Sequence, residues 1–312
     1  MKRKLSIAGV FLLLLFLLRY PQEALSASRE GMKLWLNTLL PTLLPFLILT
    51  GFLIHTDGIE KILSPFSVMW KTVLGLSPAG AYVFLLGMLC GYPMGAKLAS
   101  ELFACQKIDR REAEYLLTFT NQASPAFLTT YLAHICLEQR TSAKEILIVI
   151  FTANILCMIF FRFVIFRNNT ATRSNEIIPK KETSTTSSPG SIIDVSIMNG
   201  FETITRLGGY ILLFSIISAC IRHYWKWSPS ICSLIVGTME ITTGLHQIAL
   251  SGIPYEIRYP ISMALTAFGG FCILAQTRSV TDKRLSFLPY ISAKCMNGAV
   301  TAILLLILSK VI

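Results

Sequence analysis

The chain has 312 residues, of which 53% are hydrophobic and only 14% are charged, and its mean hydropathy is +0.61. Soluble domains carry roughly 25% charged residues, so the composition excludes an ordinary soluble protein and indicates a polytopic membrane protein whose main partner is the lipid bilayer. The net charge of +11 does not indicate nucleic-acid binding, because the basic residues are dispersed as flanks of apolar segments, where the positive-inside rule expects them.

The first apolar segment covers residues 5–18 and follows Lys2-Arg3-Lys4. A cleaved signal peptide is one interpretation, with Ser26-Ala27-Ser28 as the cleavage region. We favour a retained membrane anchor, because the next apolar segment follows closely. That segment, residues 34–54, is long enough to cross a hydrocarbon core of about 30 Å. Its prolines at positions 41 and 45 predict a kink or a half-helix.

Two broken apolar segments follow in the first half. Residues 79–92 end at Gly91-Tyr92-Pro93, and a short helix is expected over 96–106. The next apolar segment, 116–137, is broken at Ser124-Pro125. The sequence leaves open whether these pieces are re-entrant hairpins or unwound spanning helices. Residues 146–166 predict an uninterrupted span.

A polar tract rich in Ser, Thr, Pro and charge covers residues 167–191 and is typical of a flexible linker. It predicts two membrane halves, residues 1–166 and residues 192–312. Apolar stretches of the second half lie near 197–221, 230–250, 260–277 and 289–308. The whole chain therefore predicts an all-α bundle with about seven to nine membrane-embedded segments.

The second half contains breaks at nearly the same spacing as the first, at Glu240-Ile241-Thr242-Thr243-Gly244 and at Gly269-Gly270. Unpaired backbone groups in hydrocarbon cost several kcal/mol each, so such breaks are tolerated where protein or a water-filled cavity satisfies them. Matched, interrupted segments in two halves indicate a transporter site near the membrane midplane.

Three groups of residues are candidates for polar chemistry at these breaks. Glu240 is either a proton or cation site, the cap of a half-helix, or a structural carboxylate paired across the bundle. Asn121, Gln122 and Ser124 precede a helix that restarts at Pro125, so exposed N–H groups there would attract an anion or polar ligand. The alternative for this group is a clamp between helices without a ligand.

Lys97 is either a cation that meets a carboxylate substrate or a residue whose side chain reaches the interface, and Gln276 and Lys294 have the same ambiguity. The complete predicted substrate-binding set shares a position in or beside a break. It comprises Gly91, Gly95, Lys97, Asn121, Gln122, Ser124, Glu240, Thr242, Thr243, Gly269, Gly270 and Gln276. The sequence contains no hydrolase, phosphate-loop, zinc or dinucleotide signature, so we predict no enzymatic activity, no metal site and no cofactor.

The motifs resemble a known group. Leu39 to Phe46, Gly91 to Lys97, Asn121 to Pro125, Gly208-Gly209, Glu240 to Gly244 and Gly269-Gly270 are similar to those of sporulation integral membrane proteins. These belong to the nucleoside-recognition or gate domain superfamily, and the similarity is to its YlbJ-like branch. The resemblance covers nearly the whole chain apart from the linker and the N-terminal anchor.

The resemblance implies a membrane protein with two gate-type repeats that moves dipicolinic acid, an aromatic dicarboxylate, during sporulation. It places the protein in the cell membrane, and we expect the mother-cell-derived outer forespore membrane. Transport would follow alternating access at the broken helices, with a coupling proton or cation and a homo-oligomer left open. The alternatives are a carrier of nucleosides or other small solutes, and a scaffold that transports nothing.

Overall fold

The computed structural model describes residues 2–55, 63–167 and 189–311 and is helical, with no strand in these ranges. By length and composition, the described residues contain four helices that could cross a membrane, or up to six if each of two bent helix pairs forms one span. The predicted all-α membrane bundle with broken helices is therefore confirmed. The predicted linker at 167–191 lies almost entirely outside the described residues.

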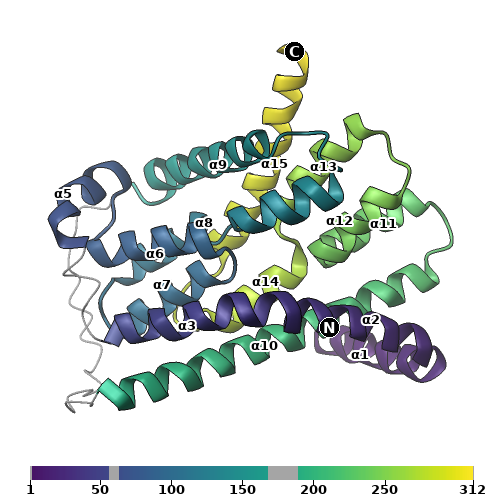
Figure 1. The fold of residues 1–312 in the computed structure, drawn as a ribbon, viewed down its shortest axis with the longest axis horizontal. Coiled ribbons are helices and arrows are strands. Elements are labelled where there is room, and N and C mark those ends of the chain that lie inside the picture. Colours follow the sequence, from purple (N-terminus) through teal and green to yellow (C-terminus); the bar gives the residue numbers. More distant parts are fainter. Residues whose placement is uncertain (1, 56–62, 168–188, 312) are drawn as a thin grey trace.

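A long antiparallel helix pair runs along one side of the molecule (Figure 1). One member consists of α2 (Pro21–Leu34), a wide π-type turn (η1, Trp35–Leu39) and α3 (Leu40–His55). The other is α10 (Pro189–Tyr224), a single helix of 36 residues. Helix α1 (Lys2–Arg19) precedes them and meets α2 at 107°.

Small residues let the two members of this pair approach closely. The indole nitrogen of Trp35 donates to the Ile204 carbonyl at 2.8 Å. A Cβ at Gly208 would lie only 2.6 Å from the ring of Trp35, and a Cβ at Gly31 would lie 2.7 Å from the Ser215 hydroxyl. Close backbone approach through small residues is typical of helix packing in membranes.

The first half then forms a helical hairpin and a broken helix. Short turns over Ser64–Leu74 (η2, α5, η3) lead to α6 (Pro78–Cys90), which packs against α7 (Met94–Ala104). Next come α8 (Arg110–Phe119) and η4 (Phe127–Cys136), separated by an unwound stretch at 120–124. An uninterrupted helix, α9 with η5 (Ala143–Ile165), follows as predicted.

The second half repeats this order. Helices α11 (Pro229–Met239) and α12 (Ile241–Leu250) form a second hairpin. Helices α13 (Tyr255–Phe268) and α14 (Gly270–Val280) form the second broken helix, and α15 (Leu288–Val311) follows. The sequence left hairpins and broken spans open as alternatives. Within the described residues, the structure contains two hairpins and two broken helices.

The two hairpins enter the bundle from opposite ends (Figure 1). At the first end, which we define by Ser77 and Asp282, the Ser77 N–H donates to Glu112 on α8 at 2.7 Å and the Asp282 N–H donates to Ser100 on α7 at 3.0 Å. At the second end, Arg258 at the start of α13 pairs with Glu138 after η4 at 3.2 Å. Hence α6 and α8 run from the first end to the middle, whereas α13 runs there from the second end.

Glycine makes each hairpin turn sharp. Gly91 ends α6 with φ of +80°, a conformation that L side chains rarely adopt. In the second hairpin, a Cβ added to Gly244 on α12 would overlap the Cα of Gly237 on α11. The arms therefore touch backbone to backbone, and the tips lie at Gly91 and at Glu240.

Candidate functional site

Each hairpin tip lies against the broken helix of its own half. In the first half, the Tyr92 N–H donates to the Gln122 carbonyl at 2.8 Å, and a Cβ on Gly91 would lie 2.7 Å from the Ser124 nitrogen. In the second half, a Cβ on Gly270 would lie 3.1 Å from the carbonyl oxygen of Thr238. The structure thus brings the predicted breaks together in pairs.

Asn121 connects the first break to the second half. It is fully buried, and its amide nitrogen donates to the hydroxyl of Thr277 on α14 at 2.9 Å and to that of Tyr290 on α15 at 2.8 Å. Its side-chain oxygen is buried without a hydrogen-bond partner. Buried polar atoms are normally paired, so this oxygen marks a place where a polar guest or water gains a bond.

Gln122 lies at the centre of a second group of contacts. Its amide nitrogen donates to Asn154 on α9 at 2.8 Å, and its oxygen accepts from the amine of Lys294 on α15 at 3.1 Å. Asn154 in turn donates to the Phe119 carbonyl at the end of α8 at 2.9 Å. Asn297 donates to Asn154 at 3.4 Å, which links α15 to α9.

Helix α15 therefore supplies residues that the predicted set lacks. Tyr290, Lys294, Asn297 and Thr301 recur at helical spacing and are all buried on the face turned to the breaks. Asn154 on α9 is a fifth residue outside that set. The signal was available in the sequence as a polar stripe with a period near 3.6 inside an apolar span.

Glu240 is the N-cap of α12. Its two carboxylate oxygens accept from the backbone N–H groups of Thr242 at 3.0 Å and Thr243 at 2.7 Å, and the side chain is 4% exposed. The Thr242 carbonyl accepts from the hydroxyl of Tyr131 on η4 at 2.7 Å. Of the readings left open by the sequence, the structure contains the half-helix cap, and Thr242 and Thr243 enter it through their main chain.

Ser124 has the corresponding position after the first break. Its hydroxyl oxygen accepts from the Phe127 N–H at 3.2 Å, where the chain resumes its helix at Pro125. A serine before a helix-starting proline is a favourable cap arrangement. The break between α8 and η4 and the break between α11 and α12 are thus each capped by a side chain that accepts backbone N–H groups.

The remaining predicted residues lie around this cluster. Gly95 packs so closely under the first break that a Cβ there would overlap the Thr120 carbonyl. Gly269, with φ of +89°, ends α13. Gln276 is buried on α14, and its amide donates to the Cys272 sulfur at 3.2 Å.

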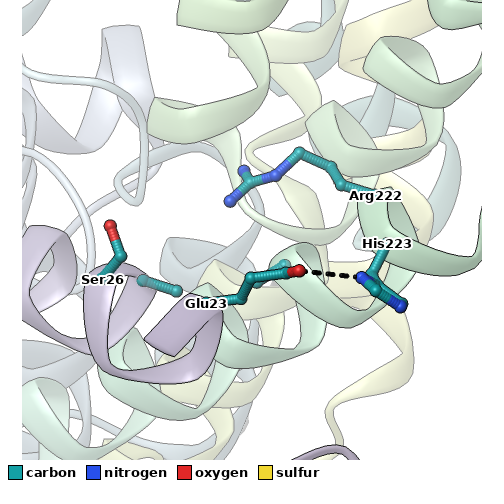
Figure 2. A pocket seen from close by; sticks show the side chains of 6 residues that line it. Glu23, Ser26, Arg222 and His223 are labelled. Carbon is teal, nitrogen blue, oxygen red and sulfur yellow. Dashed lines mark hydrogen bonds and ion pairs between the residues drawn. The ribbon is translucent and has the colours of Figure 1, made fainter. Parts of the chain in front are cut away.

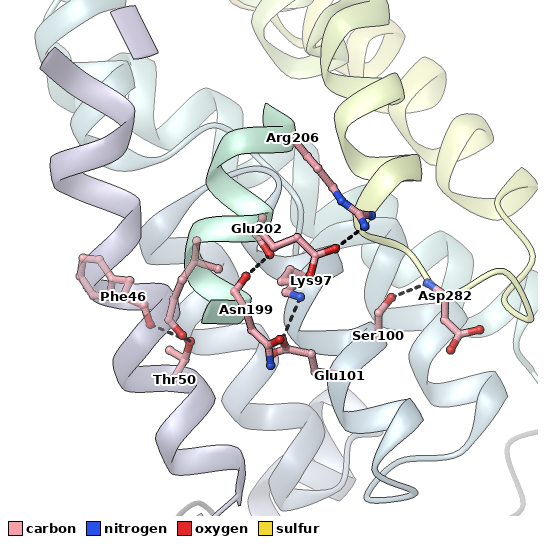
Figure 3. A network of polar contacts seen from close by, with 11 residues as sticks. Phe46, Thr50, Lys97, Ser100, Glu101, Asn199, Glu202, Arg206 and Asp282 are labelled. Carbon is pink, nitrogen blue, oxygen red and sulfur yellow. Dashed lines mark hydrogen bonds and ion pairs between the residues drawn. The ribbon is translucent and has the colours of Figure 1, made fainter. Parts of the chain in front are cut away.

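Lys97 belongs to a different group of contacts (Figure 3). Its amine pairs with Glu101 one turn along α7 at 2.9 Å. Nearby, Glu202 pairs with Arg206 on α10, and the Ser100 hydroxyl accepts from the Asp282 N–H. Hydrogen bonds from Arg284 hold the pKa of the Asp282 carboxyl below its usual range. Within the described residues, the ion pair of Lys97 is with Glu101 and not with a residue of the buried cluster.

Two surface hollows lie away from the cluster. One is lined by residues of α2 and α10, where Glu23 pairs with His223 at 2.9 Å beside Arg222 (Figure 2). The other lies at the first end, between the end of α7 and the residues that follow α14, and has a volume of about 390 Å³. Asn121, Gln122, Glu240 and Lys294 are each at most 4% exposed, so this conformation closes the cluster to solvent.

The polar groups of the cluster are mainly amides and hydroxyls, together with one amine. Amides and hydroxyls bind polar solutes, and an amine binds carboxylates. Within the described ranges, no three His, Cys, Asp or Glu side chains gather closely enough to hold a metal ion. Fold and site together define a polytopic helical membrane protein with two hairpins, two broken helices and a closed polar centre.

The chain is similar in sequence to a bacterial membrane protein. The chain is 24% identical to the sporulation integral membrane protein YlbJ of Bacillus subtilis (strain 168), over 98% of this chain and 83% of that protein. No family model matches the chain, and no solved structure matches it. The similarity supports a YlbJ-like membrane protein and extends over both halves.

Proposed function

We propose that the protein is a membrane carrier for a small carboxylate, with dipicolinic acid as the expected substrate. The observation that carries this proposal is the meeting of four interrupted helices at one buried polar cluster. Interrupted helices whose ends face each other at mid-depth are the usual construction of a solute site in secondary transporters. The breaks between α6 and α7, between α8 and η4, between α11 and α12, and between α13 and α14 all contribute here.

The opposite orientation of the hairpins supports alternating access. The α6–α7 hairpin separates the cluster from the first end, and the α11–α12 hairpin separates it from the second end. Withdrawal of one hairpin from the broken helix beside it would open the cluster to one side only. The closed cluster of this structure corresponds to the occluded stage between two such openings.

The biological setting is proposed from the relative. Because the similar protein is named a sporulation integral membrane protein, we infer that this chain also acts during sporulation. The outer forespore membrane remains our proposed location, and the two gate-type repeats, a coupling ion and self-association remain proposals with it. The division at residues 167–191 is part of the same proposal.

A second candidate is a carrier of nucleosides or other neutral solutes. The amides of Asn121, Gln122, Asn154 and Asn297 favour it, because amide groups pair well with hydroxyls and bases. Competition between labelled dipicolinate and nucleosides for the purified protein distinguishes the two candidates. A scaffold without transport would bind neither.

The test is uptake of labelled dipicolinate into liposomes that contain the purified protein. We expect saturable uptake by the wild type and a fall of at least about tenfold for Asn121→Ala, because the variant leaves Thr277 and Tyr290 without their shared partner. Ser124→Ala tests the first break in the same assay. Normal uptake by both variants at normal protein level would remove these residues from the site, and no uptake by the wild type would refute the carrier.

A further inference from the structure

We propose that Lys294 is a built-in counter-cation for the substrate carboxylate, held where other carriers bind a metal cation. Carboxylate transport by this protein would therefore need no sodium ion. The inference rests on the proposed carrier function. It adds Lys294 to the site and states that transport does not require sodium. The sequence leaves the role of Lys294 ambiguous, and this residue is outside the predicted substrate-binding set.

The first support is the burial of Lys294. Its side chain is fully buried within α15, in the interior of the bundle. Among the described residues no carboxylate forms an ion pair with it; its amine donates to two oxygens and lies 5.7 Å from the centre of the Tyr92 ring. A buried charge without a partner of opposite sign is expensive in free energy, so such a group is retained where a negatively charged guest is expected.

The second support is the nature of the two oxygens. The amine donates to the Asn121 carbonyl at 3.3 Å and to the Gln122 side-chain oxygen at 3.1 Å. Both residues follow the C-terminal end of α8, which carries the negative end of the helix dipole. In secondary transporters, unwound carbonyls and half-helix C-termini of this kind coordinate sodium ions or protons. Here the side-chain ammonium group of Lys294 has that position.

The third support is the spare hydrogen-bonding capacity around the amine. An ammonium has three N–H donors, and two of them are accounted for by Asn121 and Gln122. The side-chain oxygens of Asn121 and Asn297 and the hydroxyl of Tyr92 are buried without partners. A carboxylate can accept from the amine and from the Tyr92 hydroxyl, while a bound water can donate to the two amide oxygens.

The fourth support is the path of the lysine stem. A Cβ added to Gly269 would lie 3.5 Å from Cε of Lys294, so the stem passes the second break while the amine reaches the first. One side chain therefore touches both unwound points. A substrate bound to this amine would be held between the two halves, which is where an alternating-access site must lie.

The negative charge of Glu240 does not compensate Lys294. Both Glu240 oxygens accept backbone N–H groups of α12, and the positive end of that helix dipole favours the carboxylate. The carboxylate of Glu240 is thus stabilised by the start of α12 and not by Lys294. The charge of Lys294 is left for a substrate.

The experiment measures dipicolinate uptake into liposomes with sodium replaced by N-methylglucamine. We expect wild-type uptake to be unchanged by this replacement. Lys294→Met and Lys294→Gln should lower uptake by more than about tenfold, because removing one partner of a buried charge pair leaves the other unpaired. Lys294→Arg, which keeps the charge, should retain part of the activity.

Chemical rescue separates a lost charge from a damaged fold. Lys294→Ala should regain measurable uptake when ethylammonium is added, while the same amine should not affect the wild type. Lys144→Met is the matched control, because Lys144 is exposed at the start of α9. Size-exclusion profiles and thermal unfolding of each variant report on folding, and the Gln variant decides if the Met variant does not fold.

Two failures are distinguishable. If the wild type moves no carboxylate at all, the proposed function is wrong and this inference falls with it. If the wild type transports but requires sodium, or if Lys294→Met transports with an unchanged KM, the carrier stands and the role of Lys294 is wrong.

Discussion

At Glu240, one carboxylate satisfies two backbone N–H groups that the break between α11 and α12 leaves without intrahelical partners. Ser124 has the same task at the start of η4. Single side chains thus make interrupted backbone tolerable inside an apolar bundle. Lys294 and Asn121 differ from them, because their bonds cross between halves and leave acceptors and charge uncommitted.

Removal of the Glu240 cap should destabilise the protein. We expect Glu240→Ala to lower the free energy of unfolding by about 2 kcal/mol, at the upper end of N-cap effects, because two buried N–H groups lose their acceptor. Glu240→Gln keeps one acceptor oxygen, so its free energy of unfolding should lie between those of the wild type and Glu240→Ala. Thermal unfolding of the detergent-solubilised protein measures this. An unchanged melting temperature for Glu240→Ala would show that water replaces the carboxylate without cost.

The residues at the breaks were predictable, whereas those on α15 were harder to assign. Pro93, Pro125 and the paired glycines at 269 and 270 interrupt helices for local steric reasons that any reader of the sequence can apply. Lys294 lies in a helix without local irregularity. Its role depends on the tertiary packing that places α15 beside both breaks. The sequence shows the polar stripe on this helix but not which elements the stripe contacts. Lys97 shows the converse, since its helix starts at a break while its amine pairs with Glu101 one turn further along the helix.

At the scale of elements, the hairpins depend on backbone contact between their arms. The pair Gly237 and Gly244 and the pair Gly87 and Gly95 have the same function in the two halves, because in each pair a Cβ on one glycine would meet the other. Each pair lies about equally far on both sides of its tip. The hairpins are therefore narrow enough to fit between the surrounding helices.

A methyl group at this crossing should separate the arms. We expect Gly244→Ala to reduce the yield of folded protein and its melting temperature strongly, because the added carbon overlaps Gly237 and the backbone must move. Gly209→Ala is the matched control. Its Cβ position on α10 has no heavy atom within 4 Å, so it should be neutral or slightly stabilising.

Should both alanine variants unfold alike in a thermal melt, the close crossing would have no special part in stability. Should only Gly244→Ala do so, the narrow hairpin is required. The comparison is clean because the substitution is the same and both glycines lie within helices.

In the proposed carrier, access from the first end would require α7 and α14 to separate. Both helices start at a break and end at the hollow of about 390 Å³, where Ser100 accepts from the Asp282 N–H at 3.0 Å. Cysteines at positions 100 and 282, joined by a short reducible cross-linker, should abolish uptake, and reduction should restore it. The background needs Cys105 and Cys295 changed to serine, because both are exposed.

The control is a cross-link within the α2–α10 pair, between cysteines at positions 23 and 223, whose native side chains are 2.9 Å apart. That pair should move as one body, so its cross-link should leave uptake intact. Transport that persists with the first cross-link in place would place the moving parts elsewhere.

On the scale of the whole molecule, basic residues gather at the first end. The first end carries Lys107, Arg110, Arg111, Lys283 and Arg284 close together in the chain segments after α7 and α14. By the positive-inside rule, the first end should face the cytoplasm.

Cys105 allows a direct test of this orientation. It is exposed immediately after α7 at the first end. In a variant with Cys295 changed to serine, a membrane-impermeant maleimide should label Cys105 in inverted vesicles and not in intact cells. Labelling from outside would reverse the orientation, and with it the direction assigned to each hairpin.

The length of α10 has a consequence for the surrounding lipid. Its 36 residues extend for about 54 Å at 1.5 Å per residue, against a hydrocarbon thickness of about 30 Å. Since α2 and α3 are bound along it, the pair must tilt steeply, emerge into the headgroups, or thicken the membrane around it. The free-energy cost of each adjustment depends on the length of the lipid acyl chains. The host lipid is therefore a variable of its own in reconstitution, and a series of phosphatidylcholines from short to long chains should have an optimum rather than a monotonic trend.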